Sequence, residues 1–182
     1  AGDLVMQAPE RDGFEAAVAY AVAEQLGFDD DDVVWVRSSF EASIAPGPKD
    51  FDINLQQFSI TEEREQAVDF SSPYYETTQT VITTGDSAAA DATSIEDLTG
   101  LIVGAQTGTT SFTAAEEVIA PTGGVSAFNT NEDGKAALES GQIDALVVDL
   151  PTAFYMTGAE LDDGVIVGQL PQTAGDGDAF GI

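Results

Sequence analysis

Strands and helices alternate through the second half of the chain, and this rhythm limits the choice of fold more than any other feature. The order is strand 101–103, helix 110–119, strand 125–128, helix 131–140 and strand 145–148. Strands joined by helices run parallel, because each helix carries the chain back along the sheet. The pattern predicts a parallel α/β sheet covered on both faces, with ligands at the carboxyl ends of its strands.

The sequence of the first half of the chain indicates fewer helices and strands. Apolar residues at three- and four-residue spacing indicate an amphipathic helix over 14–26, which Gly27 ends. A short helix is expected from Thr61, because a capping residue precedes two carboxylates there. Runs rich in β-branched and aromatic residues predict strands at 33–36, 51–55 and 78–83, and the polar stretch 85–92 predicts a surface loop.

The composition removes whole classes of chemistry. The 182 residues include no Cys and no His. Disulfides, Cys/His zinc sites, Ser-His-Asp triads and Cys-His pairs are therefore excluded. The longest apolar stretch, 16–23, is far shorter than the ~20 residues that cross a bilayer.

The chain is strongly acidic. Five Lys and Arg residues stand against 33 Asp and Glu residues, for a formal net charge of −28. Such a charge repels nucleic acid and anionic lipid, so neither is an expected partner. Adaptation to concentrated salt, as in a halophilic host, explains it better than calcium binding by the run 29–32. That run lacks the alternating ligands, central Gly and terminal Glu of a calcium loop, and we predict a solvated turn.

Two segments follow apolar strands, where such sheets bind ligands. The segment Gln106-Thr107-Gly108-Thr109-Thr110 opens a helix, so its backbone N–H groups suit a carboxylate or phosphate. Ordinary turn chemistry with Thr109 as the cap is the alternative. Asp149 ends an apolar strand, where a carboxylate is costly unless it faces solvent or a cation. The alternative is an N-cap for the helix after Pro151.

Read in order, these segments resemble a known family. The stretch 51–64 reads Phe-Asp-Ile-Asn-Leu-Gln-Gln-Phe-Ser-Ile-Thr-Glu-Glu-Arg, and 68–75 reads Val-Asp-Phe-Ser-Ser-Pro-Tyr-Tyr. Further matches lie at 13–15, 98–110 and 136–149. Together they resemble the polar amino acid-binding proteins of ABC importers, the extracytoplasmic solute-binding protein family 3. Gln56, Gln57 and Glu62 depart from the family pattern, which alters the expected pocket.

The resemblance implies the two-lobed periplasmic binding protein fold of type II, in the α/β class. Each lobe is a sheet flanked by helices, and the ligand lies in the cleft between lobes. The implied division is lobe 1 over 1–75, a hinge crossover at 76–79, lobe 2 over 80–177 and the start of the return at 178–182. The family's first strand is not recognisable in 1–12, so the copy is expected to be incomplete at both ends.

The resemblance also implies roles for individual residues. Arg64 would pair with the ligand α-carboxylate, which suits a planar guanidinium, although a plain surface pair with Glu is the alternative. Asp149 would accept the α-ammonium, and Phe40 would form an aromatic wall. Support for the carboxylate would come from Ser59 and the backbone of Gln57, and from Thr110 with the backbone of Gly108 and Thr109. Gln56, Gln57 and Glu15 would line or border the side-chain pocket, which favours a polar or cationic amino acid.

The implied function is capture of a free amino acid for an ABC importer, with neither catalysis nor a cofactor. The implied partners of this monomer are the transporter's membrane subunits. The implied location is periplasmic or extracellular. The chain opens on Ala1-Gly2-Asp3 without a leader, which fits a lipid anchor on a removed N-terminal segment. Two alternatives share the fold: a cyclohexadienyl dehydratase-like enzyme, and the sensory domain of a receptor.

Overall fold

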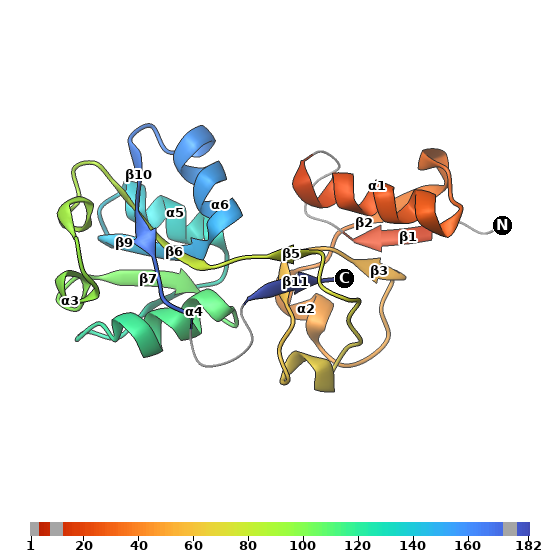
Figure 1. Ribbon diagram of the computed structural model, residues 1–182, viewed down its shortest axis with the longest axis horizontal. Helices are drawn as coiled ribbons and strands as arrows, with labels where there is room; N and C mark the ends of the chain where they lie inside the picture. Colours follow the sequence, from red (N-terminus) through yellow and green to blue (C-terminus); the bar gives the residue numbers. More distant parts are fainter. Residues whose placement is uncertain (1–3, 8–12, 173–177) are drawn as a thin grey trace. The chain divides into compact units, whose positions relative to one another are not determined.

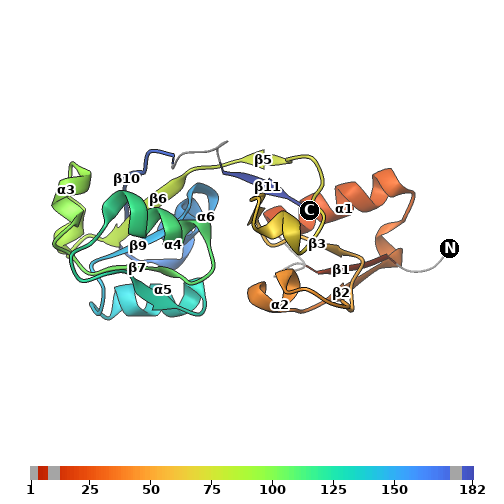
Figure 2. The same cartoon turned by 90° about the horizontal axis from the view of Figure 1, so that it is seen from below.

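The computed structural model describes residues 4–7, 13–172 and 178–182, which form two compact units (Figures 1 and 2). Unit 1 consists of the described residues of Ala1–Glu76 together with Ala179–Ile182, and unit 2 is formed within Thr77–Asp178. The chain therefore passes from unit 1 to unit 2 and returns once. Within the described residues, no helix combines the length and the apolar character that crossing a bilayer requires.

Unit 1 contains a parallel sheet in the order β2-β1-β3, formed by β1 (Leu4–Gln7), β2 (Val33–Val36) and β3 (Ile53–Asn54). Helix α1 (Phe14–Leu26) packs on it through Ala19 and Ala23, which are buried with Leu4 and Met6. Strand β1 lies where the sequence offered no recognisable strand. Its Leu4 and Met6 both point into the core, an alternation too short to identify at four residues.

A second small sheet of unit 1 has the order β4-β11-β5 and is antiparallel. Its strands are β4 (Phe58–Ser59), β5 (Tyr75–Glu76) and β11 (Ala179–Gly181). The returning strand β11 lies in the middle and contains the fully buried Phe180. The other elements of unit 1 are η1 (Asp30–Asp32), α2 (Phe40–Ile44) and η2 (Arg64–Gln66).

Unit 2 contains a five-stranded sheet in the order β10-β6-β9-β7-β8. The strands are β6 (Gln79–Thr84), β7 (Val103–Gln106), β8 (Ser126–Phe128), β9 (Ala145–Asp149) and β10 (Gly164–Gln169). Strands β7, β8 and β9 are parallel as predicted, but β6 is antiparallel to both β9 and β10. The parallel arrangement predicted from the strands over 101–148 is therefore confirmed, and the whole sheet is mixed because β6 runs opposite to both of its neighbours.

Helices cover both faces of this sheet, as Figure 1 shows with α4 on one side and α5 and α6 on the other. The α-helices are α3 (Ile95–Leu98), α4 (Thr110–Ala114), α5 (Asn131–Glu139) and α6 (Leu150–Tyr155). Unit 2 also contains the 3-10 turn η3 (Ala88–Asp91) and the π-helical turns η4 (Ala115–Ile119) and η5 (Met156–Glu160). The predicted loop 85–92 thus contains a helical turn, because Ala89 is fully buried against the sheet.

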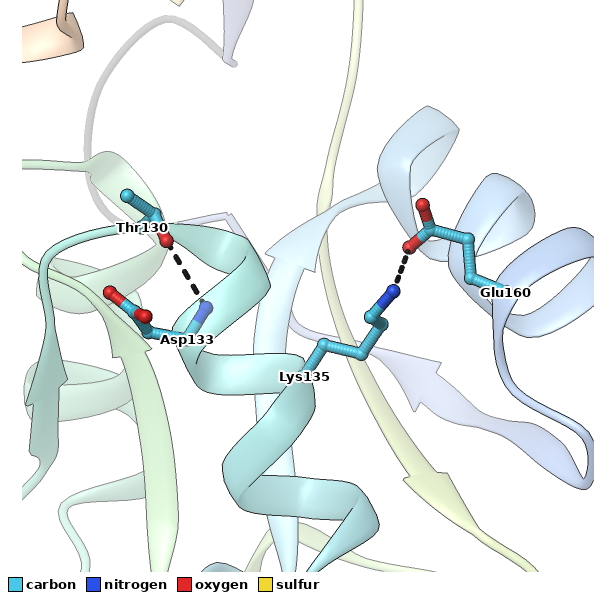
Figure 3. Close-up of polar contacts among 4 residues, drawn as sticks. All are labelled: Thr130, Asp133, Lys135 and Glu160. Atoms are coloured by element: carbon cyan, nitrogen blue, oxygen red, sulfur yellow. Dashed lines mark hydrogen bonds and ion pairs between the residues drawn. The ribbon is translucent and has the colours of Figure 1, made fainter.

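Helix α5 is fixed at its start and along its side (Figure 3). Thr130 caps it, with its Oγ1 accepting a hydrogen bond from the backbone N–H of Asp133 at 3.1 Å. Lys135 donates from Nζ to Glu160 Oε2 of η5 at 3.0 Å, and this hydrogen bond raises the pKa of Lys135. Both ends of this pair are partly exposed, so it contributes only about 0.2–1 kcal/mol.

Candidate functional site

Arg64 of unit 1 lies against two aromatic rings. Its guanidinium carbon is 5.4 Å from the centroid of Phe40 and 5.5 Å from that of Phe58. The two rings stack on each other with centroids 4.2 Å apart. Contact with aromatic faces fixes the plane of a guanidinium and adds a cation–π attraction. Phe40, the predicted aromatic wall, thus contacts Arg64 together with Phe58, a second ring that the sequence did not reveal, and its place in a ligand pocket stays a prediction.

A hydrogen bond sets the direction of the same side chain. Arg64 Nη1 donates to the carbonyl oxygen of Ser59 at 2.8 Å, and Arg64 N donates to Thr61 Oγ1 at 3.2 Å. Ser59 is buried, with 1% of its surface exposed. The structure thus brings three of the predicted site residues together, Arg64, Ser59 and Phe40. A guanidinium has five N–H donors, so one such group can serve several acceptors at once.

Glu15 and Gln57 also meet in unit 1, through a hydrogen bond of their own. Glu15 Oε2 accepts from the backbone N–H of Gln57 at 3.1 Å, and Glu15 Oε1 accepts from the hydroxyl of Tyr74 at 2.8 Å. Burial raises the pKa of Glu15, and the two hydrogen bonds oppose that shift. The N–H of Gln57 is thus directed at Glu15, which differs from its predicted support of a ligand carboxylate. The place of Glu15 at a pocket border stays a prediction.

Gln57 is in an unusual backbone conformation, with a φ of 53° in the turn between β3 and β4. A non-glycine residue in the left-handed region costs free energy, and the hydrogen bond that the Gln57 N–H donates to Glu15 Oε2 helps to hold this conformation. Beside it, Gln56 donates from Nε2 to the Ser38 carbonyl at 3.5 Å, while its Oε1 is buried without a hydrogen-bond partner among the described residues. The turn is therefore held in one shape by its neighbours.

In unit 2 the segment after β7 opens α4 as predicted. Thr109 is the N-cap, and its Oγ1 accepts from Phe112 N at 3.1 Å and donates to the carbonyl of Gln106 at 2.6 Å. Gly108 has a φ of 72°, which suits glycine. Thr109 is therefore the cap of α4, and a ligand-binding role for the backbone of Gly108 and Thr109 stays a prediction. Thr110 follows in the first turn and accepts a hydrogen bond on Oγ1 from Gln79 Nε2 at 3.1 Å.

Asp149 and Thr110 share a hydrogen-bond donor, the side-chain amide of Gln79. Gln79 Nε2 also donates to Asp149 Oδ1 at 2.9 Å and to Asp178 Oδ2 at 2.8 Å, while Gln79 Oε1 accepts from Ser111 Oγ at 2.6 Å. The sequence identified Asp149 and Thr110 but not Gln79 or Asp178. One signal was available, since a Gln that begins a strongly β-prone run needs polar partners if the strand is buried.

A metal site requires several acidic residues close together. Over residues 4–7, 13–172 and 178–182, no group of three or more acidic residues is placed to hold a metal ion. The acidic run Asp30–Asp32 forms the turn η1 and has no buried residue, so the predicted solvated turn is confirmed. Unit 1 presents the guanidinium of Arg64, and unit 2 presents the carboxylates of Asp149 and Asp178.

The family assignment follows from a sequence comparison. The model of the bacterial extracellular solute-binding proteins, family 3, matches residues 5–146. The chain belongs to this family. The resemblance inferred from the motifs at 51–75 is therefore confirmed, and the family is described as extracellular.

Relatives within this solute-binding family include an L-arginine-binding protein of Pseudomonas aeruginosa, 27% identical over 175 residues. That match covers 93% of this chain but 66% of the relative, so the chain spans less than two thirds of the relative's length. An ancestral arginine-binding protein bound to arginine is 29% identical with a TM-score of 0.78, and the match covers 100% of this chain and 84% of that one.

A third relative is an ancestral amino acid-binding protein, AncCDT-1, named as a precursor of cyclohexadienyl dehydratase. It is 30% identical with a TM-score of 0.75, and the match covers 100% of this chain and 81% of that chain. All three relatives are named as binding proteins. Their likeness confirms the predicted type II fold of this solute-binding family, with mixed α/β sheets and flanking helices.

Proposed function

We propose that the protein binds a free amino acid and presents it to an ABC importer outside the cytoplasm. In this proposal Arg64 binds the ligand α-carboxylate, Asp149 accepts the α-ammonium, and the two units close on one ligand. The transporter's membrane subunits are the proposed partners, and a monomer in the periplasm or outside the cell is the proposed state. A lipid anchor on a preceding segment belongs to the same proposal.

One observation carries this proposal: unit 1 contains an oriented cation, Arg64, and unit 2 contains an oriented carboxylate, Asp149. These charges are opposite to the two charges of an amino acid zwitterion. Arg64 is oriented by Ser59, Phe40 and Phe58, so its planar guanidinium is presented in one direction. Asp149 is held by a hydrogen bond from Gln79 at 2.9 Å. Oriented charged groups lose little entropy on binding, which favours affinity for a small ligand.

We further propose a cationic amino acid, with arginine as the first candidate. Unit 2 supplies the carboxylates of Asp149 and Asp178 near one point, and unit 1 supplies the aromatic pair Phe40 and Phe58. Carboxylates and aromatic faces both attract a guanidinium or ammonium group. The named ligand of the Pseudomonas aeruginosa relative supports the same choice. Gln56, Gln57 and Glu15 remain the proposed residues at the side-chain pocket.

A thermal-shift screen of the twenty amino acids, followed by calorimetry, tests the proposal. A ligand at a thousand times its Kd stabilises the folded protein by about 4 kcal/mol, which raises the melting temperature by roughly 8–16 °C for a chain of this size. We expect arginine to give the largest shift. No shift with any amino acid would refute the proposed function, and tightest binding of leucine or valine would refute the cationic ligand alone.

An enzyme on the same fold is a second candidate, because one relative is named as a precursor of cyclohexadienyl dehydratase. Such an enzyme removes water and carbon dioxide from arogenate or prephenate. Incubating the purified protein with each acid and assaying for the aromatic product separates the two functions. Turnover would favour the enzyme, and binding of amino acids without turnover would favour the binding protein.

A further inference from the structure

Gln79 is the meeting point of four polar side chains in unit 2. It is the first residue of β6 and is buried, with 5% of its surface exposed. Its Nε2 donates to Thr110 Oγ1, Asp149 Oδ1 and Asp178 Oδ2, and its Oε1 accepts from Ser111 Oγ. These partners come from the first turn of α4, the end of β9 and the approach to β11.

The backbone fixes this arrangement independently of the side chains. Gln79 and Asp149 face each other as a pair in the antiparallel ladder of β6 and β9. Asp178 is held beside the start of β6, because its carbonyl accepts from the N–H of Thr77 at 2.8 Å. The amide of Gln79 therefore meets both carboxylates because of the register of the sheet and the path of the returning chain.

The contacts have an electrostatic consequence. One carboxylate oxygen of Asp149 and one of Asp178 lie 2.9 and 2.8 Å from the same nitrogen, so these oxygens are at most 5.7 Å apart. The amide of Gln79 is neutral and has two hydrogens for three acceptors, so it orients the carboxylates without cancelling their charge. Two carboxylates at this separation repel each other, and a cation placed between them would relieve the repulsion.

We propose that Gln79 is the positioning residue of the cation-binding part of unit 2. It holds Asp149 and Asp178 toward each other, so that a ligand ammonium or guanidinium meets two carboxylates. This inference rests on the proposed function and adds Asp178 to the ligand-binding residues. Gln suits the position, because a Glu would add a third like charge and a Met would leave both carboxylates without this donor.

Calorimetry with arginine on the full protein tests the inference. Gln79→Met should weaken arginine binding roughly tenfold or more, and Asp178→Asn should weaken it roughly fivefold. Gln142→Met is the matched control, since Gln142 is an exposed Gln of the same unit. This control should bind arginine as the wild type does. An affinity of Gln79→Met within about twofold of the wild type, in a folded protein, would overturn the inference.

A double-mutant cycle separates positioning from a general loss of structure. Because Gln79 acts in part through Asp149, Gln79→Met should weaken arginine binding by a smaller factor in the Asp149→Asn background than in the wild type, and the remaining loss comes from Asp178. Fully additive losses would contradict this. If Gln79→Met does not fold, the variant Gln79→Glu provides the test instead. It adds a third carboxylate beside Asp149 and Asp178. The affinity for arginine should then rise with pH more steeply than in the wild type, between roughly pH 5 and pH 8. Equal slopes would count against the inference.

These outcomes distinguish the inference from the function on which it rests. A wild-type protein that binds no amino acid would refute the proposed function and this inference together. A wild-type protein that binds arginine, beside Gln79→Met and Asp178→Asn variants that bind it equally well, would refute the inference alone.

Discussion

At the scale of single residues, Arg64 is the sharpest test of the proposed site. Arg64→Ala should weaken amino acid binding by roughly 3–5 kcal/mol, because it leaves the ligand carboxylate without its partner in a desolvated site. Calorimetry with arginine measures the loss directly. Unchanged affinity in this variant would remove Arg64 from the site.

Arg64→Lys is the informative companion variant. It keeps the positive charge but loses the planar fork that donates to Ser59 and lies against Phe40 and Phe58. We expect an affinity between those of the wild type and Arg64→Ala. A lysine variant that binds as tightly as the wild type would show that charge alone is required.

Glu15 gives a second prediction, concerning pH. Because burial raises its pKa above the ordinary 4.5, the folded protein binds this proton more readily than the unfolded chain. The stability from this proton is fully present below about pH 4.5 and is lost as the pH rises through the folded pKa. Glu15→Gln removes the titration and can still accept from Gln57 N. The free energy of unfolding of Glu15→Gln minus that of the wild type should therefore increase with pH.

Urea denaturation of both proteins across this pH range checks the prediction. Subtracting the wild type removes the pH dependence of the many surface carboxylates, which both proteins share. Glu15→Ala is the control, since it removes an acceptor from both Gln57 N and the Tyr74 hydroxyl and should cost about 1–3 kcal/mol. A difference between Glu15→Gln and the wild type that stays constant with pH would contradict the raised pKa.

At the scale of elements, the contact between β10 and η5 depends on a glycine. A Cβ added to Gly164 would lie 2.6 Å from the Cα of Thr157, a backbone atom that cannot rotate away. Gly164→Ala should therefore destabilise the protein by about 1–3 kcal/mol, seen as a lower melting temperature. Gly168→Ala in the same strand is the matched control, because its new Cβ meets no atom within 4 Å. Equal melting temperatures of the two variants would contradict the close packing.

The elements that the sequence predicted well are those with a clear period. Helix α1 and strand β2 have the predicted bounds, because helical spacing followed by Gly27 and a β-branched run both leave local signals. Strand β1 has only four residues, and its sequence gave no local signal. The direction of β6 was also missed, because it depends on its pairing with β9, which periodicity within β6 cannot reveal.

The candidate site was predictable where one residue carries the signal. Asp149 is a charge at the end of an apolar strand, Arg64 is one of few basic residues and lies at the start of an expected helix, and family motifs surround both. Gln79, Asp178 and Phe58 escaped notice, because their importance comes from partners far away in the chain. Gln79 contacts Asp178 across 99 positions of sequence, and no local pattern records such a pair.

At the scale of the whole molecule, the net charge of −28 dominates the electrostatics. Like charges are closer together on the folded surface than in the expanded unfolded chain, so their repulsion opposes folding at low ionic strength. The run Asp30–Asp32 illustrates this crowding, since three consecutive carboxylates occupy one turn that has no buried residue. The energetic cost of such clusters should depend on the salt concentration rather than on packing.

Added sodium chloride should therefore stabilise the protein. The Debye length falls from about 10 Å at 0.1 M to about 3 Å at 1 M, which screens repulsion between separated carboxylates but leaves buried contacts such as Gln79 to Asp149 largely unaffected. The melting temperature should climb over this range while amino acid affinity changes little.

The variant Asp30→Asn with Asp31→Asn, which removes two charges, should melt higher than the wild type at low salt, and the difference should shrink as chloride is added. Sulfate also strengthens apolar burial, so chloride is the salt to use. A melting temperature that is flat or falling with chloride would show that repulsion between surface carboxylates does not govern the stability, and the explanation of the acidic surface as an adaptation to salt would have to be abandoned.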